Sequence, residues 1–177
     1  YLALTRRWRA LATAVGAGLA AAGVPRPMLM QSRCLLSERT APPRRFAFAA
    51  RDRIDETEQR IRSVHDARYH YIRTLSTGPT FASLNRYKEK CFPIYPLMRQ
   101  LLAEGKLSGP PMDLMQRTGP SEELYDLRTD PHEIRNLMLS TDPDHRAAHA
   151  RLSAALDTWM IETGDRGHIP EPRDVVA

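Results

Sequence analysis

Two histidines in the sequence could bind a metal ion. His145 and His149 are four residues apart, which places both imidazoles on the same side of a helix. The residues between them, Arg-Ala-Ala, lack the glutamate that accompanies such a pair in zincin metalloproteases, and no third ligand is evident. We therefore expect two solvent-facing histidines and no metal site.

A second set of side chains could bind an anion. It follows a predicted hairpin and consists of Arg60, Arg62, Arg68, His70 and Arg73. A guanidinium group can bind sulfate or carboxylate oxygens through two parallel hydrogen bonds. The same residues would also suit the solvated outer face of a sheet, which is the interpretation we favour.

A third charged group consists of Arg51, Asp52 and Arg53, with Asp55 and Glu56 close behind. We expect it just after the first strand. One interpretation is a set of structural salt bridges, and the other is a contact between an arginine and an anionic ligand.

These groups are positioned by a predicted α+β fold. Phe46 and Phe48 alternate with alanines and indicate a first strand, and residues 61–64 and 69–75 form a hairpin. Residues 124–127 supply a further strand. Together they predict a small four-stranded antiparallel sheet, and its apolar face requires a covering helix.

That helix is the long C-terminal one. Asp142 or Thr141 can cap it, Pro143 suits its first position and Gly164 suits its end. Its apolar residues recur at helical spacing, at Ala148, Leu152, Ala155, Leu156 and Trp159. We expect this stripe to pack in the core, Trp159 included.

A capped turn is predicted between the fourth strand and this helix. Asp130 can cap a helical turn that begins at Pro131, and Glu133 can complete a capping box with it. Ile134 and Leu137 would attach the turn to the core.

Proline and glycine divide the other connections. Residues 76–92 are predicted to form a long loop, and a helix should run from Pro96 until Gly105 stops it. Residues 109–111 predict another loop, and residues 168–177 a loose tail.

The charge distribution argues against a nucleic-acid-binding domain. The chain has 26 Lys and Arg and 21 Asp and Glu. The first 50 residues hold eight arginines and one acid, Glu38, which leaves 18 bases and 20 acids for residues 51–177. The predicted globular part is thus close to neutral, whereas a nucleic-acid-binding domain carries its basic patch on a folded face.

Several stretches, in the same order, resemble the C-terminal subdomain of sulfatases, most closely of the heparan N-sulfatase (N-sulfoglucosamine sulfohydrolase) type. They are residues 41–56, 60–73, 99–107, 123–137 and 159–164. The resemblance predicts a subdomain over residues 41–167. It extends weakly upstream to Gly23-Val24-Pro25.

Residues 1–40 have two interpretations. Arg6, Arg7 and Arg9 precede a small apolar run, as in a signal peptide. The alternative, which we favour, is a loosely attached helix left from the end of a catalytic domain. Gly16 and Gly18 would weaken that helix by about 1 kcal/mol each. The run is too short and too rich in Ala and Gly to span a membrane.

The resemblance implies that the complete enzyme uses calcium and a formylglycine, matured from a Cys or Ser in a C/S-x-P/A-x-R motif. Residues 34–39 are the only superficial candidate, and they carry Leu36 and Glu38 where the motif requires Pro or Ala and Arg. No positions match the family's metal ligands. We expect Cys34 and Cys91 to be free thiols, although a disulfide between them is possible.

We therefore expect a piece of a sulfatase that is inactive alone, needs no cofactor itself and completes the cleft of the catalytic domain, its missing partner. The resemblance places Arg51, Asp52 and Arg53 near the rim of that cleft, where an arginine would contact a sulfated saccharide. The alternatives are a non-catalytic binding or packing module and a degenerate gene remnant.

Overall fold

The computed structural model describes residues 19, 22–25, 44–76, 85–115 and 119–170. The chain divides into two compact units, Tyr1–Arg44 and Arg45–Ala177. In the first unit, Leu19 is helical, Gly23 has a φ of 67° and the Val24 amide donates to the Leu19 carbonyl over 2.9 Å. This is the geometry of a helix end. The rest of the predicted N-terminal helix lies outside the described residues.

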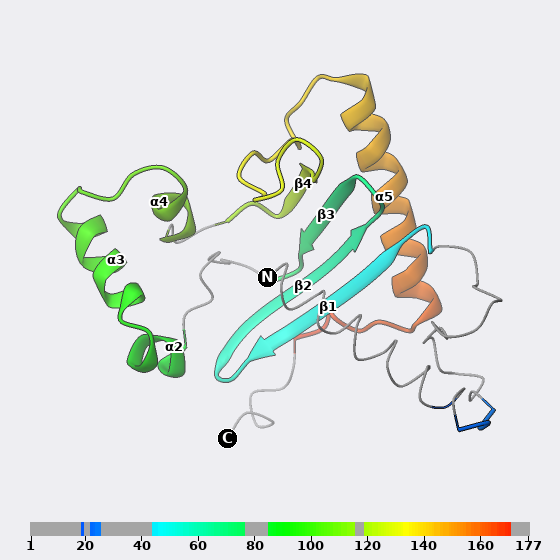
Figure 1. Cartoon of the computed structure of the whole chain (residues 1–177), viewed down its shortest axis with the longest axis horizontal. Coiled ribbons are helices and arrows are strands. Elements are labelled where there is room, and N and C mark those ends of the chain that lie inside the picture. The colour runs from blue at the N-terminus through cyan, green and yellow to red at the C-terminus, as the bar shows by residue number, and fades with distance from the viewer. Residues whose placement is uncertain (1–18, 20–21, 26–43, 77–84, 116–118, 171–177) are drawn as a thin grey trace. The chain divides into compact units, whose positions relative to one another are not determined.

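The second unit contains the predicted four-stranded antiparallel sheet, in the order β1-β2-β3-β4 (Figure 1). Its strands are β1 (Ala47–Ile54), β2 (Thr57–His65), β3 (Tyr69–Thr74) and β4 (Glu122–Asp126). Each strand pairs with its neighbour in sequence, and the hairpin turns at Asp66 as predicted: its Oδ1 accepts from the amides of Arg68 and Tyr69 over 2.8 and 2.7 Å. The α+β prediction is confirmed.

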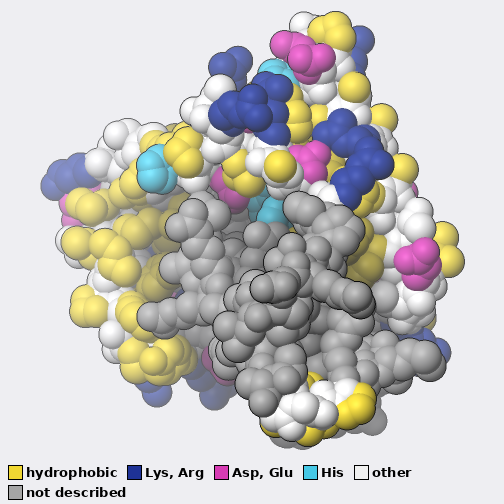
Figure 2. Space-filling view, turned by 45° about the vertical axis from the view of Figure 1, so that its right-hand side comes forward, with side chains coloured by type: hydrophobic (Ala, Val, Ile, Leu, Met, Phe, Trp, Pro, Cys, Tyr) yellow, Lys and Arg dark blue, Asp and Glu magenta, His cyan; other side chains and the backbone are white. Residues whose placement is uncertain are grey.

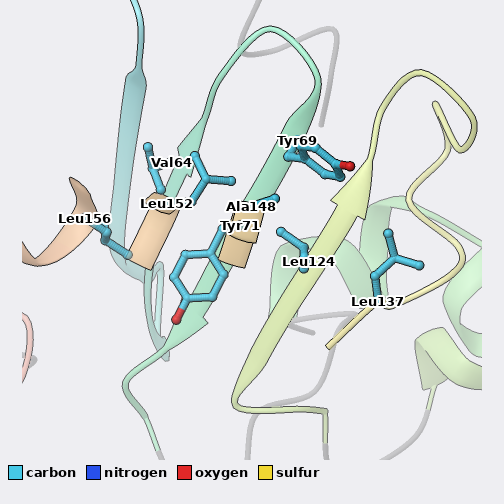
Figure 3. Packing of buried hydrophobic residues seen from close by; sticks show 8 residues of the cluster. All are labelled: Val64, Tyr69, Tyr71, Leu124, Leu137, Ala148, Leu152 and Leu156. Atoms are coloured by element: carbon cyan, nitrogen blue, oxygen red, sulfur yellow. The ribbon is translucent and has the colours of Figure 1, made fainter. Parts of the chain in front are cut away.

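Helix α5 (Pro143–Glu162) lies against the sheet. Asp142 caps it by accepting from the Asp144 amide over 2.8 Å, and Gly164 follows its end with a φ of 61°. Its buried residues, Ala148, Leu152 and Leu156, belong to the predicted stripe, whereas Ala155 and Trp159 are only partly buried. The core consists of Val64, Tyr69, Tyr71, Leu124, Leu137, Ala148, Leu152 and Leu156 (Figure 3).

Three short helices fill the connection from β3 to β4. They are α2 (Arg86–Cys91), α3 (Ile94–Ala103) and α4 (Pro110–Met115). The predicted helix before Gly105 is present as α3, but it begins at Ile94 rather than at Pro96; Gly105 lies just beyond its end at a φ of 67°. The loop predicted over residues 76–92 is wrong in part, because α2 lies within it. The loop predicted at residues 109–111 is wrong, because Pro110 is the first residue of α4. Proline suits that position, since the first residue of a helix donates no backbone hydrogen bond within it. Within the described residues, no helix is long and apolar enough to cross a membrane.

The turn before α5 differs from its prediction. Asp130 Oδ2 accepts from the amides of Ile134 and Arg135 over 2.8 and 2.7 Å, but no helix forms. Glu133 adopts a φ of 56° and its carboxylate contacts the ring of His70, so the predicted capping box is wrong. Leu137 is buried as expected, whereas Ile134 is 59% exposed and attaches to nothing in the core.

The structure tests only part of the predictions for the cysteines and for the C-terminal tail. Cys91 is an exposed free thiol at the end of α2, and Cys34 lies outside the described residues. The tail is described only as far as Pro170. The boundaries 1–40, 41–167 and 168–177 stay predictions.

We expect Trp159→Ala to destabilise the fold. The indole stacks on Phe48 of β1, with ring centroids 5.2 Å apart and planes 5° from parallel, at the edge of the core. A fully buried Trp→Ala change costs about 3–5 kcal/mol, so a partly buried one should cost about 2–4 kcal/mol. Urea denaturation measures the loss. Ile161→Ala, on the same helix and 81% exposed, is the matched control and should stay within about 0.5 kcal/mol of wild type. Equal stability of the two variants would contradict this packing.

Candidate functional site around Arg62

The sequence placed Arg51, Asp52 and Arg53 after the first strand, but they lie inside β1. Arg51 pairs with Ile61 and Arg53 with Glu58, so the register shifts between them and Asp52 sits in an irregularity of the ladder. Such an irregularity redirects the side chain that it contains. The Asp52 carboxylate consequently reaches the guanidinium of Arg62 on the neighbouring strand.

Each nitrogen of the buried Arg62 guanidinium donates a hydrogen bond. Its side chain is 3% exposed. The Nε atom donates to Asp165 Oδ2 over 2.7 Å, and Nη2 donates to Asp52 Oδ1 and Asp165 Oδ1 over 2.8 and 3.0 Å. The Nη1 atom donates to the backbone carbonyls of Arg51 and Ile61, both over 3.0 Å. A buried cation requires such a set of partners, because water no longer solvates it.

The segment after α5 closes over this guanidinium. A Cβ atom on Gly167 would lie 2.0 Å from Arg62 Nη2, so only glycine fits there. The Gly167 carbonyl accepts from Arg60 Nη1 over 3.0 Å, and its amide donates to Asp165 over 2.7 Å. Arg62 therefore connects β1, β2 and the chain beyond α5.

The pKa shifts follow from this geometry. Burial alone would lower the pKa of Arg62, but the hydrogen bonds to Asp165 and Asp52 outweigh it and raise the pKa. The same hydrogen bond from Arg62 lowers the pKa of Asp165. Both groups remain charged at neutral pH, which suits a fixed ion pair rather than a proton-transferring site.

A second arginine of β1, Arg51, is held by the neighbouring strand. Its guanidinium donates to the side-chain oxygen of Gln59, a buried amide on β2. Lys88 of α2 is half-buried, and burial together with repulsion from Arg51 lowers the pKa of its amine. The sequence did not single out Lys88, because it is one of two lysines, with Lys90, in a stretch predicted to be a loop.

The favoured interpretation of the hairpin arginines is wrong. Arg60 and Arg62 are buried rather than solvated. Arg68 pairs with Asp126 over 2.7 Å, Arg73 pairs with Asp157, and His70 pairs with Glu133 over 2.7 Å. Their partners are thus acidic groups of this chain, and they form no exposed row for an external anion.

The two histidines of α5 pack on the sheet and are only partly exposed, so they are not the solvent-facing pair that the sequence predicted. The His145 ring lies 6.2 Å from that of Tyr69, and the His149 ring lies 5.3 Å from that of Tyr71. The described residues contain no group of three or more His, Cys, Asp or Glu side chains able to hold a metal.

A known sulfatase is similar to this chain in sequence. No family model matches the sequence. The chain is 33% identical over 142 residues to the ulvan-active sulfatase of Formosa agariphila, a match that covers 80% of this chain and 23% of that protein. This chain is related to the sulfatases. Its similarity to the heparan N-sulfatase type in particular stays a prediction.

Solved sulfatase structures share the fold. A 2-O GAG sulfatase matches with a TM-score of 0.54 and 20% identity, over 89% of this chain and 26% of that one. A protein solved with its substrate D-glucosamine-2-N,6-O-disulfate matches with a TM-score of 0.54 and 14% identity, over 88% of this chain and 25% of that one. The chain has the fold of the sulfatase C-terminal subdomain and spans about a quarter of these relatives.

Sulfatase relatives imply calcium and formylglycine in the complete enzyme. The residues of this sulfatase-related chain that the structure describes do not fit either group: they include no acidic cluster for calcium. The only superficial formylglycine candidate, at residues 34–39, lies outside them.

We expect Gly167→Ala to destabilise the fold by about 1–3 kcal/mol, because the new methyl group would displace the Arg62 guanidinium from its partners. Gly164→Ala is the control. It meets no atom within 4 Å but carries a φ of 61°, so it should cost only the left-handed backbone penalty of about 1–2 kcal/mol. Urea denaturation compares them. The double variant with Arg62→Met distinguishes the cause: the loss from Gly167→Ala should shrink when the guanidinium is absent. An unchanged loss would show that the clash is elsewhere.

Proposed function

We propose that this chain is the C-terminal, cleft-completing part of a sulfatase that hydrolyses sulfate esters or sulfamates of saccharides. The observation that carries the proposal is its relationship to about a quarter of an ulvan-active sulfatase, together with the fold of the sulfatase C-terminal subdomain. Within that enzyme, its own role is structural: it closes the cleft and presents polar side chains toward a saccharide. The resemblance to the heparan N-sulfatase type favours a sulfamate among the substrates.

The three rim candidates divide into two roles. Asp52 is committed to Arg62 through a hydrogen bond of 2.8 Å, which makes it a positioning residue. Arg51 and Arg53 carry the cations that would contact the sulfated saccharide, since guanidinium groups suit sulfate oxygens. The irregularity at Asp52 fixes the strand that holds both arginines.

The proposed partner is the catalytic domain of the sulfatase, and the exposed apolar side chains of α2–α4 are its docking surface. These side chains are Tyr87, Phe92, Ile94, Leu97, Leu102 and Leu114. Hydrophobic side chains gather at the left of Figure 2, the side on which α2–α4 lie in Figure 1. A large exposed apolar patch marks a protein contact in an otherwise soluble fold. Because the matched part of this chain spans only about a quarter of each relative, a catalytic domain is the partner that we propose.

We expect the chain alone to hydrolyse neither an aryl sulfate nor a glucosamine sulfamate, with calcium added. The described residues contain no group of three or more His, Cys, Asp or Glu side chains able to hold a metal ion. The measurement is sulfate release by the purified chain, compared with a boiled sample. Co-expression with the catalytic domain of the Formosa agariphila relative should restore turnover. Turnover by the chain alone that survives Cys34→Ala would contradict the proposal.

We also expect the chain to bind a hydrophobic dye and to self-associate until the catalytic domain is added. The double variant Ile94→Glu/Leu97→Glu should reduce dye binding and abolish co-purification with that domain. Its melting temperature should change little, since both side chains are about half exposed. Ile161→Glu, at an exposed site on α5, is the control and should behave as wild type. A monomeric chain that binds no dye and ignores the catalytic domain would instead favour an independent binding module.

A further inference from the structure

Helix α2 lies beside the turn between β1 and β2 and is hydrogen-bonded to it (Figure 1). Asn85 caps the helix and is 4% exposed, and its Nδ2 atom donates to Asp55 Oδ2 over 2.6 Å. The backbone amide of Arg86 donates to Glu56 Oε1 over 2.7 Å. Two consecutive acidic residues of the hairpin turn thus bind the first turn of α2, from 30 residues earlier in the sequence.

Each member of the Asp55–Asn85 pair has a defined geometry. Asn85 Oδ1 accepts from the Lys88 amide over 2.8 Å, so one end of the side-chain amide caps the helix while the other end binds Asp55. Asp55 has a φ of 49° and lies between the paired residues Ile54 and Thr57. A residue with a side chain rarely adopts this left-handed conformation, and Asp and Asn tolerate it best. The pair therefore joins a defined hairpin turn to a defined helix start.

The position of α2 in turn fixes that of α3. The rings of Tyr87 and Phe92 lie 5.6 Å apart and those of Phe92 and Tyr95 lie 6.5 Å apart, both edge to face. Arg99 of α3 forms an ion pair with Glu89 of α2. The two helices thus form one corner, and a rotation of α2 on the sheet would move the exposed apolar side chains of α3 with it.

We propose that Asp55 and Asn85 are positioning residues, which hold this corner in the orientation that the catalytic domain binds. The inference rests on the proposed function, because the partner is the one proposed for the exposed apolar side chains of α2–α4. A surface that has its binding orientation for only a fraction of the time binds with an affinity reduced by that fraction. A hydrogen bond to a carboxylate is strong enough to keep this fraction close to one.

A cycle of three variants tests the pair in the full chain. Asn85→Asp keeps a good helix cap but places two carboxylates against each other. Asp55→Asn keeps an oxygen that accepts from the Asn85 amide. The double variant Asp55→Asn/Asn85→Asp restores the hydrogen bond with its direction reversed, from an amide in the turn to a carboxylate at the cap.

The first measurement is the affinity for the catalytic domain of the Formosa agariphila relative, by calorimetry. Asn85→Asp should weaken binding about tenfold, the loss expected when one hydrogen bond to a carboxylate is replaced by repulsion. Asp55→Asn and the double variant should bind as wild type. A purely electrostatic effect on the partner would instead shift the two single variants in opposite directions, and that result would overturn the proposal.

Hydrogen exchange of the free chain separates positioning from general stability. In Asn85→Asp, the Arg86 amide and the amides of α2 should exchange faster than in wild type, whereas those of β3 and α5 should keep their protection. Equal loss of protection across these elements would overturn the proposal. Asp55→Gly is the second variant, because glycine adopts the φ of 49° without strain and removes the carboxylate. It should reproduce the weakened binding.

The proposed function and this inference fail differently. If the wild-type chain and all the variants bind the catalytic domain equally, the function stands and the positioning role fails. If the wild-type chain does not bind that domain, the docking surface fails and the inference fails with it. If only Asn85→Asp and Asp55→Gly lose binding but the assembled enzyme releases no sulfate, the positioning role stands and the sulfatase function fails.

Discussion

The buried guanidinium of Arg62 is the constraint on which the rest of the folded unit depends. A cation withdrawn from water is tolerated only when fixed acceptors replace the lost solvation, and removal of one acceptor leaves an uncompensated charge. Here the acceptors come from three separate places: Asp52 in β1, backbone carbonyls of β1 and β2, and Asp165 beyond α5. The irregularity in β1, the close approach of Gly167 and the path of the chain after α5 are therefore parts of one arrangement.

The sheet register divides the face under α5 into an apolar row and a charged row. Val64, Tyr71 and Leu124 are paired across β2, β3 and β4, and the helix covers them. One step along, Arg62 pairs with Arg73, and Arg73 with Glu122. Each of these arginines finds an acidic partner, Arg73 on α5 itself through Asp157. Burial of apolar area supplies the stability of the first row, whereas the second row fixes the orientation of the helix and of the segment that follows it.

Much of this fold could be predicted from local sequence rules, and the errors arise where long-range contacts override those rules. The strands, α3 and α5 follow from periodicity and from caps such as Asp142, which act within one or two turns. The turn at Glu133 was mispredicted because its carboxylate bonds to His70, 63 residues away. Arg62 occupies a strand position at which the sequence pattern would equally suit a solvated arginine. Only its hydrogen bond to Asp165, 103 residues later, distinguishes a buried arginine from a solvated one. The surroundings of Lys88 depend on Asp55, which binds the cap of α2 from 30 residues earlier in the sequence, and on the ring of Tyr95 in α3.

Neighbouring residues of β1 serve the fold and the proposed function separately. At its irregularity, Asp52 is committed to Arg62, while the neighbouring Arg51 is held by Gln59 of β2. One strand therefore carries both the anion that the interior requires and a cation suited to a sulfated ligand.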